Sequence, residues 1–426
     1  MIQKRKIAAA AVAATFLAAT AASAEVQLRF ECAQDGNECD TMMTIFKQFE
    51  AKHPDIKVKM DLVPYKAILE NLPVDLAAGT GPDLAKVTDL GGLHKYYLDL
   101  SPYVEKTYWE DNFGKTLDWY RAGPQDKGIY GLQTQLTITG AFVNKTLFDQ
   151  ANVALPGKDA TWDDWAKASR EVAKATGTRY PMAMDRSGHR FAGLAIPYGA
   201  TYFDADGNPE LNDPGFAAAS KQFVAWNADG TMDRNVWAGQ GGTSYADATK
   251  EFVNGELVFY YSGSWQIQKF ADQIGDAFDW EVVPAPCGPA GPGHCSGMPG
   301  GSGVVGFKST KHPKEVAELL NYLAQPDNYA MLEAKSLNIP ANATVAKAGV
   351  KYEGATPGAA KALNAFSAQV PTISPVGYAY QGYKNNRAMF NITVTRLTQA
   401  IVGELSLTEA LDRMSADLKQ AVNAAQ

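Results

Sequence analysis

The alternation of strand-like and helix-like segments constrains the fold of this chain more than any other feature. Residues 26–33 (VQLRFECA) have the pattern of a strand, and the helix that follows is expected to be capped by Asp40. Residues 53–63 alternate as a second strand, and residues 66–89 contain a helix, a Gly-rich stop and a third strand. Strands separated by helices are typical of an α/β layer built on a central sheet.

A second region with the same alternation follows. Residues 138–144 (ITGAFVN) form a strand pattern and residues 145–153 a short helix pattern. Thr161 and Asp164 form a capping box that starts a helix running to about Thr176. Because 426 residues exceed one typical core, two α/β domains are expected.

The C-terminal third contains further regular elements. A Pro- and Gly-rich loop precedes a strand at 303–307 (GVVGF), and Pro313 occupies the first position of a helix. The last 50 residues have a helical pattern. The expected buried stripe of the helix that starts at Pro313 consists of Val316, Leu319, Leu320 and Leu323.

The N-terminal 24 residues have the composition of a secretory signal. A basic head precedes an Ala-rich apolar stretch of about 15 residues, which is followed by an A-x-A site that ends at Ala24. We therefore expect export and cleavage before Glu25. No cysteine lies at the cut, and Cys32 is further along the chain, so a lipid anchor is not expected.

Charge and composition narrow the class of protein. The net charge is −7, and removal of the signal would make the chain more acidic still, the opposite of a typical nucleic-acid-binding protein. We therefore expect no nucleic-acid partner. The aromatic content of 11%, with eight Trp, suits a protein that offers aromatic surfaces to a ligand.

The four cysteines form two close pairs in the sequence. Cys32 and Cys39 are near each other, as are Cys287 and Cys295, and an exported chain meets oxidants, so two local disulfides are expected. Cross-pairing of the two couples stays open, and zinc is the rival because His294 neighbours Cys295. The spacing fits no zinc finger, and the histidines form no H-x-H or H-E-x-x-H pattern, so we expect neither a metal nor another cofactor.

Five stretches, in order along the chain, resemble one known family. They are AAGTGPDLAKVTD (77–89), YGLQTQLTITGAFVNKTLFDQANVALP (130–156), ATWDDW (160–165), YYSGSW (260–265) and GGSGVVGFKSTKHPKEVAELLNYLAQPDN (300–328). Together they are similar to the extracellular solute-binding proteins of ABC importers, family 1, the group that includes maltose- and glycerophosphodiester-binding proteins. Two positions depart from the usual pattern: Val143 replaces the Tyr of a Tyr-Asn-Lys core, and Asp164 replaces a Glu.

The resemblance implies a type II periplasmic binding protein fold, in which two α/β lobes are joined by a multi-strand hinge with the ligand cleft between them. It assigns 25–135 and 303–335 to the N-terminal lobe, and 136–302 and 336–426 to the C-terminal lobe. It also implies a monomeric protein of the periplasm that binds a carbohydrate and delivers it to a membrane permease without catalysis.

Trp265 is the first candidate for ligand contact. The strand pattern stops at 262–264 (SGS), and a break of this kind can place the indole ring in a cleft, where the C–H face of a sugar stacks on it. The alternative is a Trp that only fills the core beneath the loop.

Four further candidates follow strands of the first region. Thr88 and Asp89 come at the end of the third strand, where open α/β sheets present ligand-binding loops, although Asp89 is equally a helix cap. Gln34 and Asp35 lie on the loop that a Cys32–Cys39 disulfide would fix, which reduces the entropy lost on binding. A purely structural role for that loop is the alternative.

The other candidates lie in the second region, the hinge and the C-terminal segment. Charged side chains after a strand either contact a ligand or are simply solvated on the surface. Glycines near the hinge either let a ligand approach the backbone closely or only allow the chain to bend. The C-terminal residues either reach the ligand or belong to a surface helix. These candidates are Asp185, Arg186, Gly301, Ser302, Tyr380 and Arg387.

Two alternatives to a neutral carbohydrate stay open from the sequence. The same fold can bind a polyol, a glycerol phosphodiester or an anionic sugar, which the arginines would favour. A secreted glycoside hydrolase would need two carboxylates at a set separation. Asp83, Asp89 and Asp185 supply carboxylates, but nothing in the sequence singles out a pair.

Overall fold

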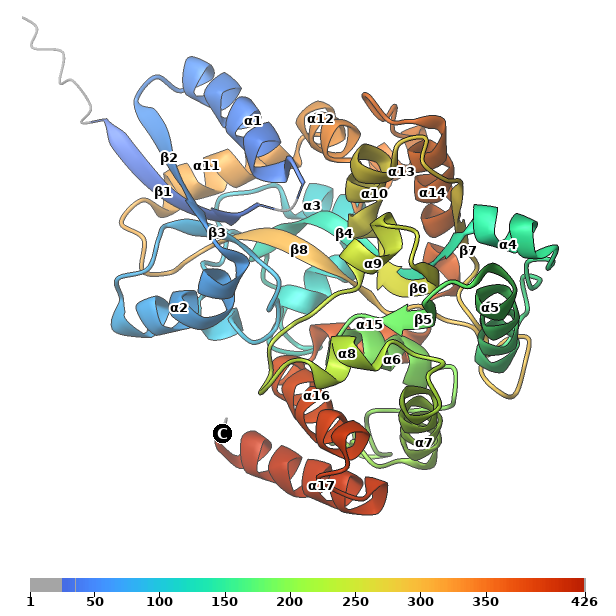
Figure 1. Ribbon diagram of the computed structural model, residues 1–426. Helices are drawn as coiled ribbons and strands as arrows, with labels where there is room; N and C mark the ends of the chain where they lie inside the picture. The colour runs from blue at the N-terminus through green and yellow to red at the C-terminus, as the bar shows by residue number, and fades with distance from the viewer. Residues whose placement is uncertain (1–24, 35, 425–426) are drawn as a thin grey trace, which may run out of the picture.

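A computed structural model describes residues 25–34 and 36–424. The expected signal sequence (1–24) and the candidate Asp35 lie outside the described residues. The strands form one mixed sheet in the order β2-β1-β3-β8-β4-β6-β5, with β7 also paired to β4 (Figure 1). The strands are β1 (Val26–Ala33), β2 (Ile56–Val63), β3 (Leu84–Val87), β4 (Gly131–Asn144), β5 (Tyr180–Met184), β6 (Leu257–Gly263), β7 (Trp280–Val283) and β8 (Pro299–Gly306).

Strand β4 connects the two parts of the sheet. Its residues 131–138 pair antiparallel with β8, which continues to β3, β1 and β2. Its residues 139–144 pair instead with β6 and β7, and β6 continues to β5. We call the elements around β1–β3 the first lobe and those around β5–β7 the second lobe, and β4 and β8 run between them.

Helices cover the sheet on both lobes (Figure 1). In the first lobe α1 packs on β2 and α12, α11 packs on β8, and α13 packs on α3 and α12. Those helices, with α2, are α1 (Glu38–Lys52), α2 (Tyr65–Ala78), α3 (Lys106–Phe113), α11 (Pro313–Ala324), α12 (Pro326–Ser336) and α13 (Ala343–Ala348).

The second lobe carries the remaining helices. α5 packs on β5 and β6, while α16 packs on α6, α7, α8 and α17. They are α4 (Lys145–Ala151), α5 (Trp162–Thr176), α6 (Gly188–Ala195), α7 (Pro214–Ala228), α8 (Arg234–Ala238), α9 (Thr249–Val253), α10 (Ile267–Ile274), α14 (Pro357–Ser367), α15 (Pro375–Gly382), α16 (Asn386–Val402) and α17 (Leu407–Ala424).

The lobe boundaries remain a proposal. Boundaries after residues 135 and 302 fall within β4 and β8, the strands that both parts of the sheet share. The boundary expected after 335 lies before α13, which packs against the first-lobe helices α3 and α12. We therefore propose that the third crossing lies between α13 and α14.

Several local predictions are confirmed and one is wrong. The expected stripe of the helix α11 is buried, and the strands at 138–144 and 303–307 are parts of β4 and β8. The cap predicted at Asp40 is wrong, because α1 already begins at Glu38. The side chain of Gln34 accepts a hydrogen bond from the Cys39 amide (3.1 Å) and so satisfies a backbone donor in the first turn.

Both local disulfides are present. Cys32 bonds to Cys39 and Cys287 to Cys295, which leaves no free cysteine among the described residues. The first bond links the end of β1 to the first turn of α1. Within the described residues, no helix combines the length and apolar character needed to cross a membrane.

The capping box at α5 gives a first quantitative expectation. Thr161 Oγ1 accepts from the Asp164 amide (3.2 Å), and the Asp164 carboxylate accepts from the Thr161 amide (2.9 Å). Thr161→Ala should therefore lower the free energy of unfolding by about 1 kcal/mol, measured by urea denaturation. Thr44→Ala, which alters an exposed residue in the interior of α1, is the matched control; equal stability of both variants would show that this cap contributes nothing.

Candidate functional site

Trp265 lies at the boundary between the lobes. Strand β6 ends at Gly263, one 3-10 turn spans Ser264–Gln266, and α10 begins directly after it. The indole is partly exposed, and a Cβ at Gly263 would lie 2.0 Å from it, so only glycine permits this close approach. The ring lines a narrow gap of about 10 Å³ between the lobes, bounded by Gly36, Gln135, Ser264, Trp265, Gln268, Ser336, Leu337 and Asn338.

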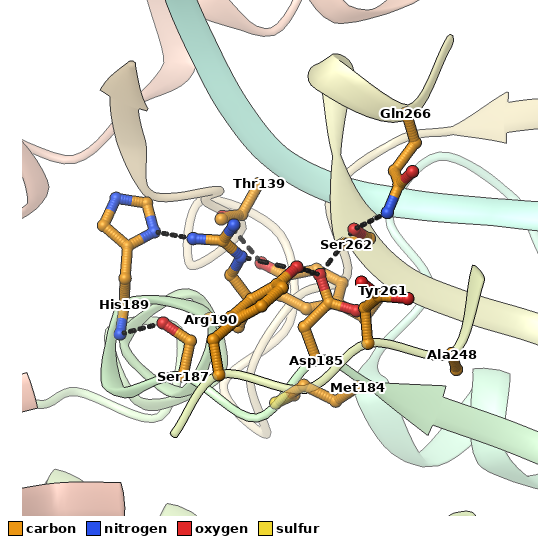
Figure 2. A network of polar contacts seen from close by, with 12 residues as sticks. Thr139, Met184, Asp185, Ser187, His189, Arg190, Ala248, Tyr261, Ser262 and Gln266 are labelled. Carbon is orange, nitrogen blue, oxygen red and sulfur yellow. Dashed lines mark hydrogen bonds and ion pairs between the residues drawn. The ribbon is translucent and has the colours of Figure 1, made fainter. Parts of the chain in front are cut away.

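A buried carboxylate, that of Asp185, is linked to the indole through Arg190. Asp185 follows β5, is fully buried, and accepts hydrogen bonds from the Tyr245 hydroxyl (2.8 Å), the Ser262 hydroxyl (2.6 Å) and the Tyr260 hydroxyl. Burial raises the pKa of Asp185, and the charge of Arg190 partly offsets that shift. Figure 2 shows Asp185 at the centre of this network, with Ser262 linked onward to Gln266.

Arg190 joins the carboxylate to the aromatic ring. Its Nε lies 3.8 Å from Asp185 Oδ2, and the guanidinium carbon lies 3.9 Å from the centre of the Trp265 ring. A guanidinium against an aromatic face is attracted to the ring quadrupole. The three side chains therefore form one contiguous cluster in the second lobe, in which Asp185 is buried and Trp265 is partly exposed.

His189 connects this cluster to the hinge. The ring is buried, and its Nε2 lies 2.9 Å from the Pro299 carbonyl oxygen. Its Nδ1 lies 3.1 Å from Arg190 Nη1 (Figure 2). Nε2 therefore donates to the carbonyl, while Nδ1 accepts from the arginine. Burial, together with the charges of Arg190 and Arg387, lowers the pKa of His189 well below its ordinary value, so the ring stays neutral.

The pKa of His189 predicts a loss of stability in acid. Below about pH 6.5 the unfolded chain binds a proton on this residue that the folded protein does not bind. The free energy of unfolding should therefore fall by about 1 kcal/mol more in the wild type than in His189→Gln between pH 7.5 and pH 5.5, measured by urea denaturation. His53→Gln, at a partly exposed site, is the control, and parallel pH profiles of wild type and His189→Gln would contradict the assignment.

The first lobe contributes a second polar group to the boundary. Thr88 Oγ1 lies 2.9 Å from the Tyr65 hydroxyl and accepts a hydrogen bond from Arg387 Nη2 of the second lobe (3.4 Å). Asp89 accepts from the Gly92 amide (3.3 Å), so it also stabilises a local turn. Burial raises the pKa of Asp89, and the nearby charge of Arg387 partly offsets that effect.

The structure does not bring all the sequence-predicted residues to this boundary. Gln34 caps α1 as described, whereas Arg186 is buried and donates to backbone carbonyl groups. Tyr380 is fully buried, and its ring stacks on Tyr202 with a centroid distance of 4.1 Å. Gly301 and Ser302 lie in β8 on the hinge. The candidates at or beside the boundary are Trp265, Asp185, Thr88, Asp89 and Arg387, and ligand contact by them stays a prediction.

Several residues at or near the boundary were missing from the sequence-based candidates, and three of them illustrate why. Tyr65 follows β2, so the strand-end argument that selected Thr88 also applies to it. Gln268 faces Gly36 so closely that a Cβ there would lie 2.2 Å from its amide oxygen. Tyr245 lies in a Gly-rich segment without regular periodicity, and no local signal marks it.

The chain is similar to known solute-binding proteins. A family model described as bacterial extracellular solute-binding protein matches residues 35–330. The arabinooligosaccharide-binding protein of Bacillus subtilis is 28% identical over 288 residues, which span 65% of this chain and 64% of that relative. The mannitol-binding protein of Pseudomonas aeruginosa is 23% identical over 421 residues, 92% of this chain and 90% of that protein.

The fold is shared with a solved structure. An ABC substrate-binding protein from Listeria monocytogenes in complex with cycloalternan superposes with a TM-score of 0.78 at 18% identity, covering 94% of this chain and 99% of that chain. The expected type II periplasmic binding protein fold is thereby confirmed. With the family model matching more than half of its residues, the chain belongs to the bacterial extracellular solute-binding protein family.

Proposed function

We propose that this protein is the solute-binding component of an ABC importer, which binds a carbohydrate between its lobes and delivers it to membrane permease subunits. In this account it acts as a monomer in the periplasm. The partly exposed indole of Trp265, placed in a gap lined by both lobes, is the observation that carries the proposal. Relatives named for arabinooligosaccharide, galactooligosaccharide and multiple-sugar binding support it.

The chemistry around the gap suits a polyhydroxylated solute. The C–H face of a sugar ring can stack on the indole, while its hydroxyl groups donate to carboxylates and accept from guanidinium groups. Gln135, Gln268 and Asn338 add amide groups that can both donate and accept. Lobe closure would then remove the solute from water without chemical change.

Charge balance favours a neutral carbohydrate over an anionic one. Arg190 is paired with Asp185 at 3.8 Å, and the charge of Arg387 acts on the half-buried carboxyl of Asp89 across the boundary. Each cation therefore has a carboxylate near it in the protein itself. An acidic sugar would bring a second negative charge to each cation, which is unfavourable in a poorly hydrated site.

The carboxylates also favour binding over hydrolysis. Asp185 is fully buried and already accepts from three hydroxyl groups, and Asp89 accepts from the Gly92 amide. A glycoside hydrolase needs an acid and a base or nucleophile free to act on opposite sides of the bond. We therefore propose that Asp185 holds the hydroxyl groups of its three protein partners in place and that Asp89 holds the turn at Gly92, and that neither carboxylate acts in catalysis.

A thermal-shift panel tests the proposal. Arabino-, galacto- and malto-oligosaccharides, mannitol, a glycerol phosphodiester and a uronic acid are each added to the purified protein. A solute present at about 100 times its dissociation constant should stabilise the folded state by roughly 2.7 kcal/mol. We expect stabilisation by a neutral oligosaccharide. Stabilisation by the phosphodiester or the uronic acid alone would show that the ligand is anionic, and formation of a product would show that the protein is an enzyme.

A further inference from the structure

We propose that Arg186 is a positioning residue that fastens the Gly-rich segment 239–246, and that this segment holds Tyr245 as a second aromatic surface of the ligand site. The inference rests on the proposed function and deepens it, because two aromatic surfaces suit a solute of two or more sugar rings. It also gives Arg186 a role other than direct contact with the solute.

The guanidinium of Arg186 holds three separate backbone positions. Nε donates to the Trp237 carbonyl (3.1 Å), Nη2 donates to the Gly242 carbonyl (2.8 Å), and Nη1 donates to the Ser244 carbonyl. Its own backbone amide donates to the Ala246 carbonyl (2.8 Å). One residue thus holds the segment at its middle and its end, and also holds the last turn of α8 just before the segment begins.

The segment has few other attachments. Residues 239–245 are exposed, and they lie over a cavity of about 380 Å³ that separates residues 239–242 from the C-terminal half of α16. Gly242 has a φ of 59°, in the left-handed region that other residues seldom adopt. A chain of this composition has high conformational freedom, so fixed hydrogen bonds must supply most of its order.

The charge of Arg186 fits an internal role. The side chain is 1% exposed, and no carboxylate of the described residues forms an ion pair with it. Its remaining side-chain contact is a hydrogen bond from Nη2 to Thr398 Oγ1 on α16 (3.1 Å). The planar fork of arginine reaches these divergent acceptors at once, whereas the single ammonium of lysine cannot.

The fastened segment places Tyr245 against Arg190, the side chain that also contacts Trp265. The Tyr245 hydroxyl donates to Asp185, yet the residue is 44% exposed, so much of its ring faces solvent. The Arg190 guanidinium carbon lies 5.7 Å from the centre of the Tyr245 ring and 3.9 Å from that of Trp265. Arg190 therefore contacts both rings, and a sugar unit on Trp265 would have its neighbour within reach of Tyr245.

Limited proteolysis tests the fastening without any solute. In Arg186→Lys, cleavage by a nonspecific protease within 239–246 should be at least 10-fold faster, while cleavage within α1 and α11 should be unchanged. Thr398→Val removes one partner of Arg186 from the opposite side and should give a smaller increase in the same segment. Unchanged cleavage within 239–246 in both variants overturns the fastening, and Thr398→Val decides alone if Arg186→Lys does not fold.

Calorimetry with a mixture of arabino- and malto-oligosaccharides of two to five units tests the role of Tyr245. Tyr245→Ala should weaken binding by roughly 10-fold, as expected for the loss of one stacked ring, whereas Tyr245→Phe should stay within about 3-fold of the wild type. Arg186→Lys should weaken binding alone but add little in the Tyr245→Ala background, because it acts through that ring.

Together, the measurement on the segment 239–246 and the calorimetry distinguish a wrong role for Arg186, a wrong role for Tyr245 and a wrong proposed function. Additive effects of Arg186→Lys and Tyr245→Ala, or equal losses in Tyr245→Phe and Tyr245→Ala, would overturn the stacking role of Tyr245. Absence of binding by the wild type to every sugar in the mixture would overturn the proposed function and the role of Tyr245 with it. The proteolysis measurement decides the fastening in either case.

Discussion

Asp185→Ala should lower the free energy of unfolding by about 3–5 kcal/mol, the largest effect we expect from a single substitution. The carboxylate is fully buried, accepts from the hydroxyls of Tyr245, Tyr260 and Ser262, and balances the charge of Arg190. Its removal leaves a partly buried cation and three buried hydroxyl groups without their acceptor. Urea denaturation at pH 7 measures the change.

A matched control isolates the contribution of burial. Asp272→Ala alters an exposed carboxylate on α10, so its effect should stay within about 0.5 kcal/mol. Asp185→Asn keeps the shape of the side chain but loses its charge, so its loss of unfolding free energy should lie between those of Asp185→Ala and Asp272→Ala. If Asp185→Ala were no more destabilising than Asp272→Ala, the network around Asp185 would not be a structural centre of the site.

Trp265→Ala should weaken the binding of a stabilising oligosaccharide by roughly 5- to 150-fold, which corresponds to about 1–3 kcal/mol of stacking. The ring is partly exposed in the gap between the lobes, so its truncation removes ligand contact more than core packing. Isothermal titration calorimetry measures the change, with the free energy of unfolding determined in parallel.

The controls for Trp265 separate stacking from general damage. Trp265→Phe keeps a smaller aromatic face and should recover part of the affinity. Tyr103→Ala removes a ring that is 46% exposed elsewhere on the first lobe and should leave binding unchanged. Equal affinities for wild type and Trp265→Ala would place the solute away from this ring.

Local patterns predicted much of the fold. The capping box at Thr161, the buried stripe of α11 and the two disulfides depend on residues close in sequence, and all are present. The length of β4 was missed, because Gln133 and Gln135 interrupt the apolar pattern ahead of residue 138. Those amides are buried in the hinge, where Gln133 bonds to Tyr120 and Gln135 bonds to Asn338, partners that no local pattern identifies.

For the candidate site too, local patterns identify some residues, whereas contacts between distant parts of the chain determine the position of others. Trp265 and Thr88 were selected because each follows a strand, and strand ends at the sheet boundary determine their position. Tyr380 was selected because the family resemblance implies that its C-terminal segment reaches the cleft, but Tyr202, far away in the sequence, covers its ring. The burial of Arg186 likewise depends on the segment 239–246, whose path depends on contacts that only the folded chain provides.

Equilibrium dialysis with a radiolabelled oligosaccharide selected by thermal shift tests the central claim most directly. We predict that the wild type retains one equivalent of sugar, that the sugar is recovered chemically unchanged, and that Trp265→Ala retains far less at the same concentration. Recovery of cleaved sugar, or equal retention by both proteins, would contradict a carbohydrate bound without turnover against this indole between the two lobes.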